Sequence, residues 1–124
     1  MAVESDNTKW VVACATDDID EEDVLRFDHE GASYAVYRLA KGFHASDGWC
    51  THEQAHLADG FVVNGEIECP LHQGRFDIIS GKPLSPPVCV KLKTYPVRVE
   101  GQRVLIGLPA TAEGAGKDAT RNAA

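Results

Sequence analysis

Two short segments of the chain carry the residue types that bind metal ions, Cys50-x-His52 and Cys69-x-x-His72. Each segment offers one thiolate and one imidazole, and sixteen residues separate His52 from Cys69. Four such side chains can bind a single zinc ion, or a [2Fe–2S] cluster with cysteines on one iron and histidines on the other. The first site would be structural, and the second would carry electrons.

The order of the ligands distinguishes these two alternatives. Zinc sites usually take their ligands in pairs of one kind, from Cys-x₂₋₄-Cys and His-x₃₋₅-His spacings. Here each segment supplies one cysteine and one histidine. This arrangement favours a two-iron cluster held between two loops, each loop giving its cysteine to one iron and its histidine to the other. A zinc site remains the alternative.

The segment between the two motifs explains how they meet. Two short β-favouring runs flank Asn64-Gly65, the residue pair that most strongly indicates a two-residue hairpin turn. Counting outward from that turn places Gly60 opposite Cys69. The hairpin therefore holds the end of the first loop beside the start of the second.

Local geometry favours convergence within each loop. In an extended segment, Cys50 and His52 point to the same side, because side chains alternate with a period of two. In the second segment, the fixed φ of Pro70 favours a tight turn that brings Cys69 and His72 together.

Strand-forming runs dominate the remaining sequence, and no long amphipathic helix is indicated. We expect an all-β domain of several short antiparallel strands. The runs outside the central hairpin are Trp10–Cys14, Val24–Phe27, Tyr34–Leu39, Val97–Glu100 and Arg103–Ile106.

The domain boundaries follow from these runs. Residues 1–9 are expected to form an N-terminal arm and residues 10–108 the folded domain, with a cluster-binding subdomain at about 49–88. Residues 109–124 are rich in Ala, Gly and Thr with scattered charge, so we expect a disordered tail there.

Composition excludes several classes of protein. A chain of 124 residues that is 44% hydrophobic and 25% charged is typical of one globular domain. No apolar run approaches the roughly 18 residues of a membrane span, and the N-terminus lacks the features of a signal peptide, so a cytoplasmic protein is expected. The net charge of −7 argues against nucleic-acid binding.

Cys14 and Cys89 lie in apolar surroundings and are interpreted as small buried residues, not as disulfide partners. The acidic segment 17–23 is interpreted as a solvated turn. An alternative is that it steers the docking of basic partners.

Two residues near the ligand loops have a structural interpretation. His56 has no partner at ligand spacing and is expected to be a surface residue. Trp49 adjoins Cys50 and is expected to pack in the core or to limit the access of water to the site.

The two motifs and their spacing closely resemble those of Rieske-type [2Fe–2S] ferredoxins from bacterial ring-hydroxylating oxygenase systems. The resemblance continues through Gly81–Leu84 and Lys93–Val97 and covers about residues 10–108. It implies an antiparallel β-sandwich with a cluster-binding subdomain of two ligand loops joined by a hairpin. It assigns two cysteines to the inner iron and two histidines to the outer iron of one [2Fe–2S] cluster. These ligands are Cys50, Cys69, His52 and His72. Pro86-Pro87 resembles the proline-bearing loop that packs over the cluster in Rieske folds, which implies a cover for the cluster, or else it forms only a rigid turn.

The same resemblance implies a function. The chain would be a one-electron carrier, not an enzyme, that takes electrons from a flavoprotein ferredoxin reductase. It would pass them to a terminal oxygenase that hydroxylates aromatic compounds. Alternatives are the ferredoxin of a diiron monooxygenase and a zinc-bound structural module. A monomer is expected, because a shuttle must alternate between partners.

Departures from a sister family indicate the reduction potential. Rieske proteins of cytochrome bc complexes carry an additional cysteine in each loop, where this chain has Ala55 and Leu71. They also donate hydroxyl hydrogen bonds to the cluster from the positions of Gly74 and Phe76. Fewer donors stabilise the reduced cluster less, so a potential near the low end of the Rieske range is expected.

Overall fold

The computed structural model describes residues 8–51, 54–71, 73–85 and 90–109. These residues form β-strands and two short 3₁₀-helices, which confirms the all-β prediction. Within these ranges, no helix is both long enough and apolar enough to cross a bilayer. In chain order the elements are β1 (Thr8–Ala15), η1 (Thr16–Asp18), β2 (Asp23–His29), β3 (Ala32–Leu39), β4 (Gly42–Asp47), η2 (Leu57–Asp59), β5 (Phe61–Val63), β6 (Glu66–Glu68), β7 (Arg75–Asp77), β8 (Pro83–Ser85), β9 (Thr94–Tyr95), β10 (Val97–Glu100) and β11 (Arg103–Pro109).

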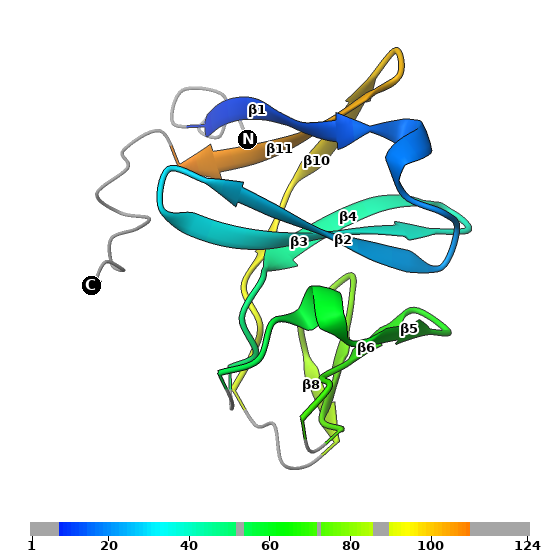
Figure 1. The fold of residues 1–124 in the computed structure, drawn as a ribbon, viewed down its shortest axis with the longest axis vertical. Helices are drawn as coiled ribbons and strands as arrows, with labels where there is room; N and C mark the ends of the chain where they lie inside the picture. The colour runs from blue at the N-terminus through cyan, green and yellow to red at the C-terminus, as the bar shows by residue number, and fades with distance from the viewer. Residues whose placement is uncertain (1–7, 52–53, 72, 86–89, 110–124) are drawn as a thin grey trace.

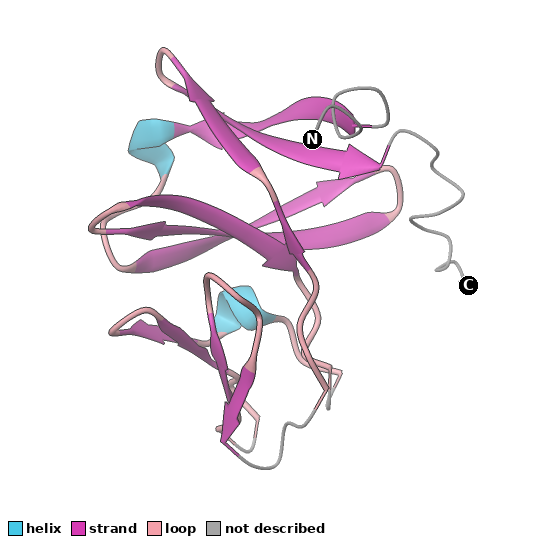
Figure 2. Cartoon of the chain, turned by 180° about the vertical axis from the view of Figure 1, so that it is seen from behind, coloured by secondary structure: helices cyan, strands magenta, loops and turns pink. Residues whose placement is uncertain are grey.

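The strands form three antiparallel sheets. Two of them have the orders β1-β11-β10 and β2-β3-β4-β9 and pack as the layers of a sandwich, in the upper part of Figure 1. The third sheet, β5-β6-β7-β8, lies below them with η2, and two connecting segments join it to the sandwich. Figure 2 shows the same two connections from behind, and they pair where the Asp47 N–H donates to the Lys93 carbonyl oxygen at 2.9 Å.

The central hairpin has the predicted turn and register. Asn64 and Gly65 have φ angles of 52° and 80°, and two positive values are what a type I′ turn requires. Val63 pairs with Glu66 across this turn. The hairpin joins β5 to β6 and so connects the two segments that carry the predicted ligands.

Strand β3 is buried on both faces. Tyr34 and Val36 belong to a core shared with β1 and β11, whereas Ala35, Tyr37 and Leu39 belong to a core shared with the third sheet. The alternation follows from the two-residue period of a strand. The β2-β3-β4-β9 sheet is therefore the middle layer of the molecule.

Several expectations about individual segments can be compared with the structure. Cys14 is buried in the core between the two sandwich sheets, as expected, whereas Cys89 lies outside the described residues. The acidic side chains between positions 17 and 23 are exposed. Strand β11 continues to Pro109, one residue into the expected tail, because Pro109 pairs with Thr8. The remainder of that tail lies outside the described residues.

A buried hydroxyl pair in the middle layer yields a prediction about stability. Ser46 donates its hydroxyl hydrogen to the Asp47 carbonyl oxygen at 2.8 Å, so the Tyr37 hydroxyl, 2.7 Å away, donates to Ser46. Tyr37→Phe leaves Ser46 with a partner and should cost about 1 kcal/mol in the free energy of unfolding. Ser46→Ala leaves the Tyr37 hydroxyl buried without its acceptor and should cost about 2 kcal/mol. Urea denaturation of both variants measures the difference, and a larger loss for Tyr37→Phe would contradict this assignment of donors.

Candidate metal centre

The first ligand loop begins at Cys50, shortly after β4 ends. The Cys50 N–H donates to the Ala55 carbonyl oxygen at 2.9 Å, which closes the loop over residues 50–55. One residue further out, Trp49 and His56 form an antiparallel β-bridge. The loop is therefore held at its base by a short stem of paired backbone.

The second loop closes in the same way. The Cys69 N–H donates to the Gly74 carbonyl oxygen at 2.8 Å, which closes the loop over residues 69–74. One residue further out, Glu68 of β6 pairs with Arg75 of β7. Each predicted cysteine ligand is thus the first residue of a loop that its own backbone N–H closes.

The two cysteine side chains lie in one core. Cys50 is 7% exposed and Cys69 is 1% exposed. Both belong to the hydrophobic cluster beneath β3, together with Phe76, Ile67 and Leu92. The structure therefore brings together the two predicted ligands that it describes.

The two predicted histidine ligands, His52 and His72, lie outside the described residues, and so does Pro86-Pro87. Across the described part of the chain, no three His, Cys, Asp or Glu side chains converge as a metal site would require. These residues therefore offer no competing metal site. The donor chemistry of two buried thiols in an apolar core suits an iron–sulfur cluster.

A close approach of two backbones joins the loops. Gly60 follows η2 and lies against Glu68, the residue before Cys69. A Cβ atom at Gly60 would lie 2.0 Å from the Glu68 carbonyl oxygen, so only glycine fits there. This contact agrees with the predicted placement of Gly60 opposite Cys69.

The first loop is also tied to the chain that returns to the sandwich. The Thr51 hydroxyl donates to the Val90 carbonyl oxygen at 2.9 Å. Three apolar side chains on or beside the loops are exposed to solvent, namely Trp49 at 46%, Leu71 at 46% and Val90 at 57%. Trp49 is thus not a core residue, and the loop region exposes three large apolar side chains.

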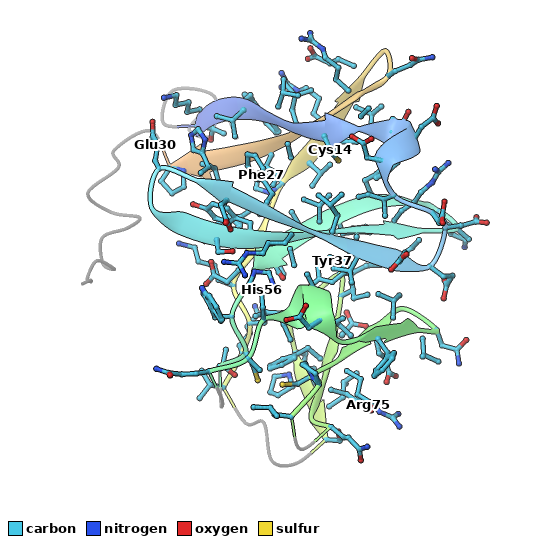
Figure 3. All side chains as sticks on the ribbon, in the orientation of Figure 1. Cys14, Phe27, Glu30, Tyr37, His56 and Arg75 are labelled. Carbon is cyan, nitrogen blue, oxygen red and sulfur yellow. The ribbon has the colours of Figure 1, made fainter. Side chains whose placement is uncertain are left out.

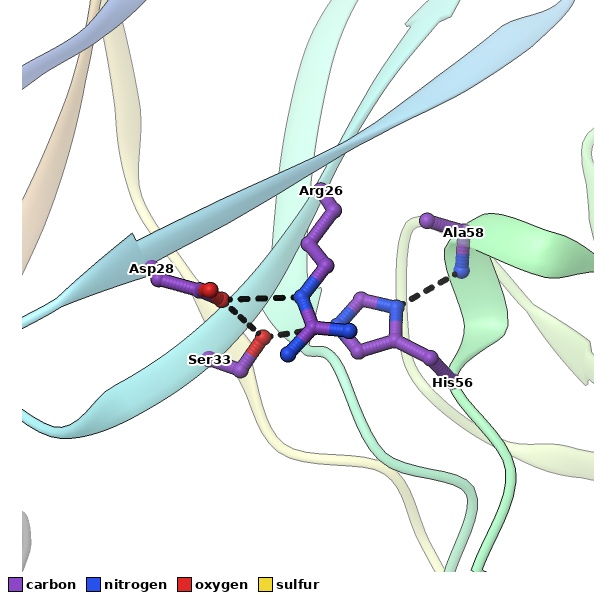
Figure 4. Close-up of polar contacts among 5 residues, drawn as sticks. All are labelled: Arg26, Asp28, Ser33, His56 and Ala58. Atoms are coloured by element: carbon purple, nitrogen blue, oxygen red, sulfur yellow. Dashed lines mark hydrogen bonds and ion pairs between the residues drawn. The ribbon is translucent and has the colours of Figure 1, made fainter.

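The expectation for His56 is wrong, because this residue is 3% exposed. Its ring lies between the sandwich and the third sheet in Figure 3. Nδ1 accepts the Ala58 N–H at 3.0 Å, and Nε2 is 2.7 Å from the Ser33 hydroxyl oxygen (Figure 4). Burial, together with the positive charge of Arg26, lowers the pKa of His56 below its usual value. The sequence gives no sign of this, because Ser33 lies 23 residues away.

Comparison with protein families gives one match over most of the domain. Residues 9–96 match the family described as the Rieske [2Fe–2S] domain. A ferredoxin component of a naphthalene 1,2-dioxygenase system from Pseudomonas aeruginosa is 50% identical over 100 residues, which are 81% of this chain and 96% of that protein. A biphenyl dioxygenase ferredoxin subunit from Pseudomonas sp. (strain KKS102) is 37% identical over 95 residues, 76% of this chain and 87% of that protein.

Solved structures show the same architecture. A ferredoxin from Sphingomonas yanoikuyae B1 superposes with a TM-score of 0.77 at 32% identity, over 82% of this chain and all of that one. A complex of reduced oxygenase and oxidized ferredoxin in carbazole 1,9a-dioxygenase contains a chain that matches with a TM-score of 0.76 at 34% identity. That match covers 82% of this chain and 93% of the other.

The contact between Gly60 and Glu68 gives a test of how the loops are joined. Gly60→Ala should force the two backbones apart, destabilise the fold by about 2 kcal/mol and lower the amount of iron bound per chain. Gly65→Ala, in the turn of the same hairpin, is the control. It should cost about 1 kcal/mol through its left-handed φ and leave the iron content unchanged. Chemical denaturation and iron analysis measure both effects, and equal iron contents in the two variants would contradict the role of Gly60.

Proposed function

This chain belongs to the Rieske [2Fe–2S] domain family, and we propose that it is the ferredoxin component of an oxygenase system that hydroxylates aromatic compounds. As a ferredoxin it carries electrons in one Rieske-type [2Fe–2S] cluster and is not itself the catalyst. The family match therefore favours the cluster over the zinc alternative. The observation that carries the proposal is 50% identity across nearly the full length of a dioxygenase ferredoxin.

We assign the cluster ligands within this proposal. Cys50 and Cys69 would hold the inner iron, and His52 and His72 the outer iron. Supporting the assignment, both cysteines lie in one buried core at the start of similarly closed loops. Two neutral imidazoles in place of two thiolates leave the cluster less negative, so reduction is easier than in ferredoxins with four cysteine ligands.

The partners follow from the same proposal. One electron would enter from a flavoprotein ferredoxin reductase and leave for the terminal oxygenase. Docking at the loop end is supported by three exposed apolar side chains on or beside the ligand loops, those of Trp49, Leu71 and Val90. A related ferredoxin has been solved in complex with its oxygenase. A monomer suits alternation between two partners, and a cytoplasmic location suits cysteines that serve as ligands and not as disulfide partners.

The relatives favour a dioxygenase over a diiron monooxygenase as the electron acceptor. The naphthalene and biphenyl relatives are both named as parts of dioxygenase systems. We therefore propose a ring-hydroxylating dioxygenase as the terminal partner.

Spectroscopy tests the cofactor and its ligands. Anaerobically purified protein should be brown, and dithionite should produce a paramagnetic signal with a lower average g value than clusters with four cysteine ligands give. His52→Ala and His72→Ala should each lose the cluster, because each removes a ligand of the outer iron. The control His29→Ala removes a histidine of β2 and should retain the colour. Retention of an unchanged spectrum in His52→Ala or His72→Ala would refute the ligand assignment.

Redox titration tests the predicted potential. The midpoint should lie near the low end of the range of about −150 to +300 mV. Phe76→Tyr supplies a hydroxyl beside the second loop and should raise the midpoint by about 40 mV, the equivalent of one hydrogen bond of about 1 kcal/mol. Phe27→Tyr, in the separate sandwich core, is the control and should leave it unchanged. A wild-type midpoint well above zero would contradict an electron donor of this class.

A further inference from the structure

One residue of the sandwich holds both sides of the first ligand loop. The Ser33 carbonyl oxygen on β3 accepts the Gly48 N–H at 2.9 Å, just before the loop. The Ser33 hydroxyl oxygen lies 2.7 Å from His56 Nε2, just after the loop. Figure 4 shows this hydroxyl between His56 and Asp28.

The hydrogen bonds determine which nitrogen of His56 carries the proton. The Ser33 hydroxyl donates to Asp28, and this bond lowers the pKa of the Asp28 carboxyl, which therefore stays ionised. Ser33 has only one hydroxyl hydrogen, so its oxygen must accept from His56 Nε2–H. Nδ1 accepts the Ala58 N–H and carries no proton. His56 is therefore the neutral tautomer with its proton on Nε2.

Two further residues, Arg26 and Trp49, complete a closed circuit of contacts with these residues. Arg26 donates from Nε to Asp28 at 3.0 Å, and its guanidinium carbon lies 5.3 Å from the centroid of the Trp49 ring. Trp49 in turn packs edge-on against His56, with ring centroids 4.9 Å apart. Trp49 is the residue directly before Cys50, so this circuit of contacts includes the neighbour of the first predicted ligand.

The backbone beside His56 leaves room for its ring. A Cβ atom on Gly48 would lie 2.4 Å from His56 Nε2. Only glycine at position 48 therefore allows the imidazole to reach Ser33. The glycine, the histidine and the serine fit together as one unit that fastens the loop to β3.

We propose that His56 is a positioning residue for electron transfer, which fixes the stem of the first ligand loop, residues 48–50 and 55–57, against β3 through Ser33. The inference rests on the proposed function, because this loop begins with Cys50. A loop that is held rigidly keeps its ligands in one arrangement in both redox states, which favours rapid transfer.

Amide hydrogen exchange and paramagnetic resonance of the full-length protein test the proposal. His56→Ala and Ser33→Ala should each accelerate exchange of the loop-stem amides of Gly48, Cys50 and Leu57 about tenfold, because each removes the hydrogen bond that joins the two side chains. The double variant should exchange no faster than either single variant. Each variant should keep its brown colour and bound iron. The paramagnetic resonance signal of its reduced cluster should be broader, because the loop samples several arrangements.

Two matched variants separate positioning from general destabilisation. His56→Gln places an amide donor near the position of Nε2 and should restore slow exchange and a narrow signal. Ser80→Ala breaks another serine–aspartate hydrogen bond, to Asp77, in an exposed turn away from the first loop. It should leave both measurements unchanged.

The pH dependence of amide exchange distinguishes a hydrogen-bonding role of His56 from a role in packing alone. The charged groups facing His56 are Arg26 and Asp28 on β2 and Asp59 on η2. Protonation takes place at Nδ1 and removes the hydrogen bond that Nδ1 accepts from the Ala58 N–H, whereas Nε2 can still donate to Ser33. Because the folded-state pKa is below the unfolded one, the bond to Ala58 is intact above the ordinary histidine range and is lost as pH falls through the lowered pKa. Exchange of the stem amides, corrected for intrinsic rates, should accelerate there in the wild type. It should not do so in His56→Gln.

The proposal would be overturned if His56→Ala had the amide exchange rates and the signal width of the wild type. Additive effects in the double variant would also overturn it. A colourless wild-type protein would instead refute the proposed function. The exchange data would still decide whether His56 anchors the loop.

Discussion

The burial of β3 on both of its faces is the constraint on which the rest of the structure depends. Residues 34–37 of β3 are all buried, and a strand with consecutive buried side chains needs a packed layer on each side. The β1-β11-β10 sheet supplies one layer, and the third sheet with η2 supplies the other. The two ligand loops extend from this second layer, so the core that stabilises the fold also orients the loops. Tyr37 and the two cysteines share that core.

Electron transfer at this site depends on where the loops begin and how they are held. Cys50 and Cys69 start their loops inside an apolar core, where solvent reorganises little when the charge of a cluster changes. Each loop is closed by its own backbone hydrogen bond. The first loop has an additional polar attachment through His56 and Ser33.

The local part of the fold could be predicted from the sequence because its signals lie within a few residues of each other. Asn64-Gly65 predicts both the turn and the register, since a type I′ turn needs two residues that tolerate positive φ. The close approach of Gly60 to Glu68, the residue before Cys69, follows from that register. The environment of His56 could not be predicted in this way. Its partner Ser33 belongs to another layer, and nothing in the spacing of the two residues links them.

The sequence by itself indicated the chemistry of this protein, because the types and order of the proposed ligands Cys50, His52, Cys69 and His72 favour a [2Fe–2S] cluster over a zinc ion. It also determined the hairpin that joins the two loops. Only the tertiary structure decided which side chains surround the proposed metal site. Burial of an imidazole depends on whether both of its nitrogens find partners. For His56 these partners are Ser33 on β3 and Ala58 on η2, which come together only when the sandwich packs against the third sheet. His56, which sequence reasoning placed at the surface, lies at the centre of that packing.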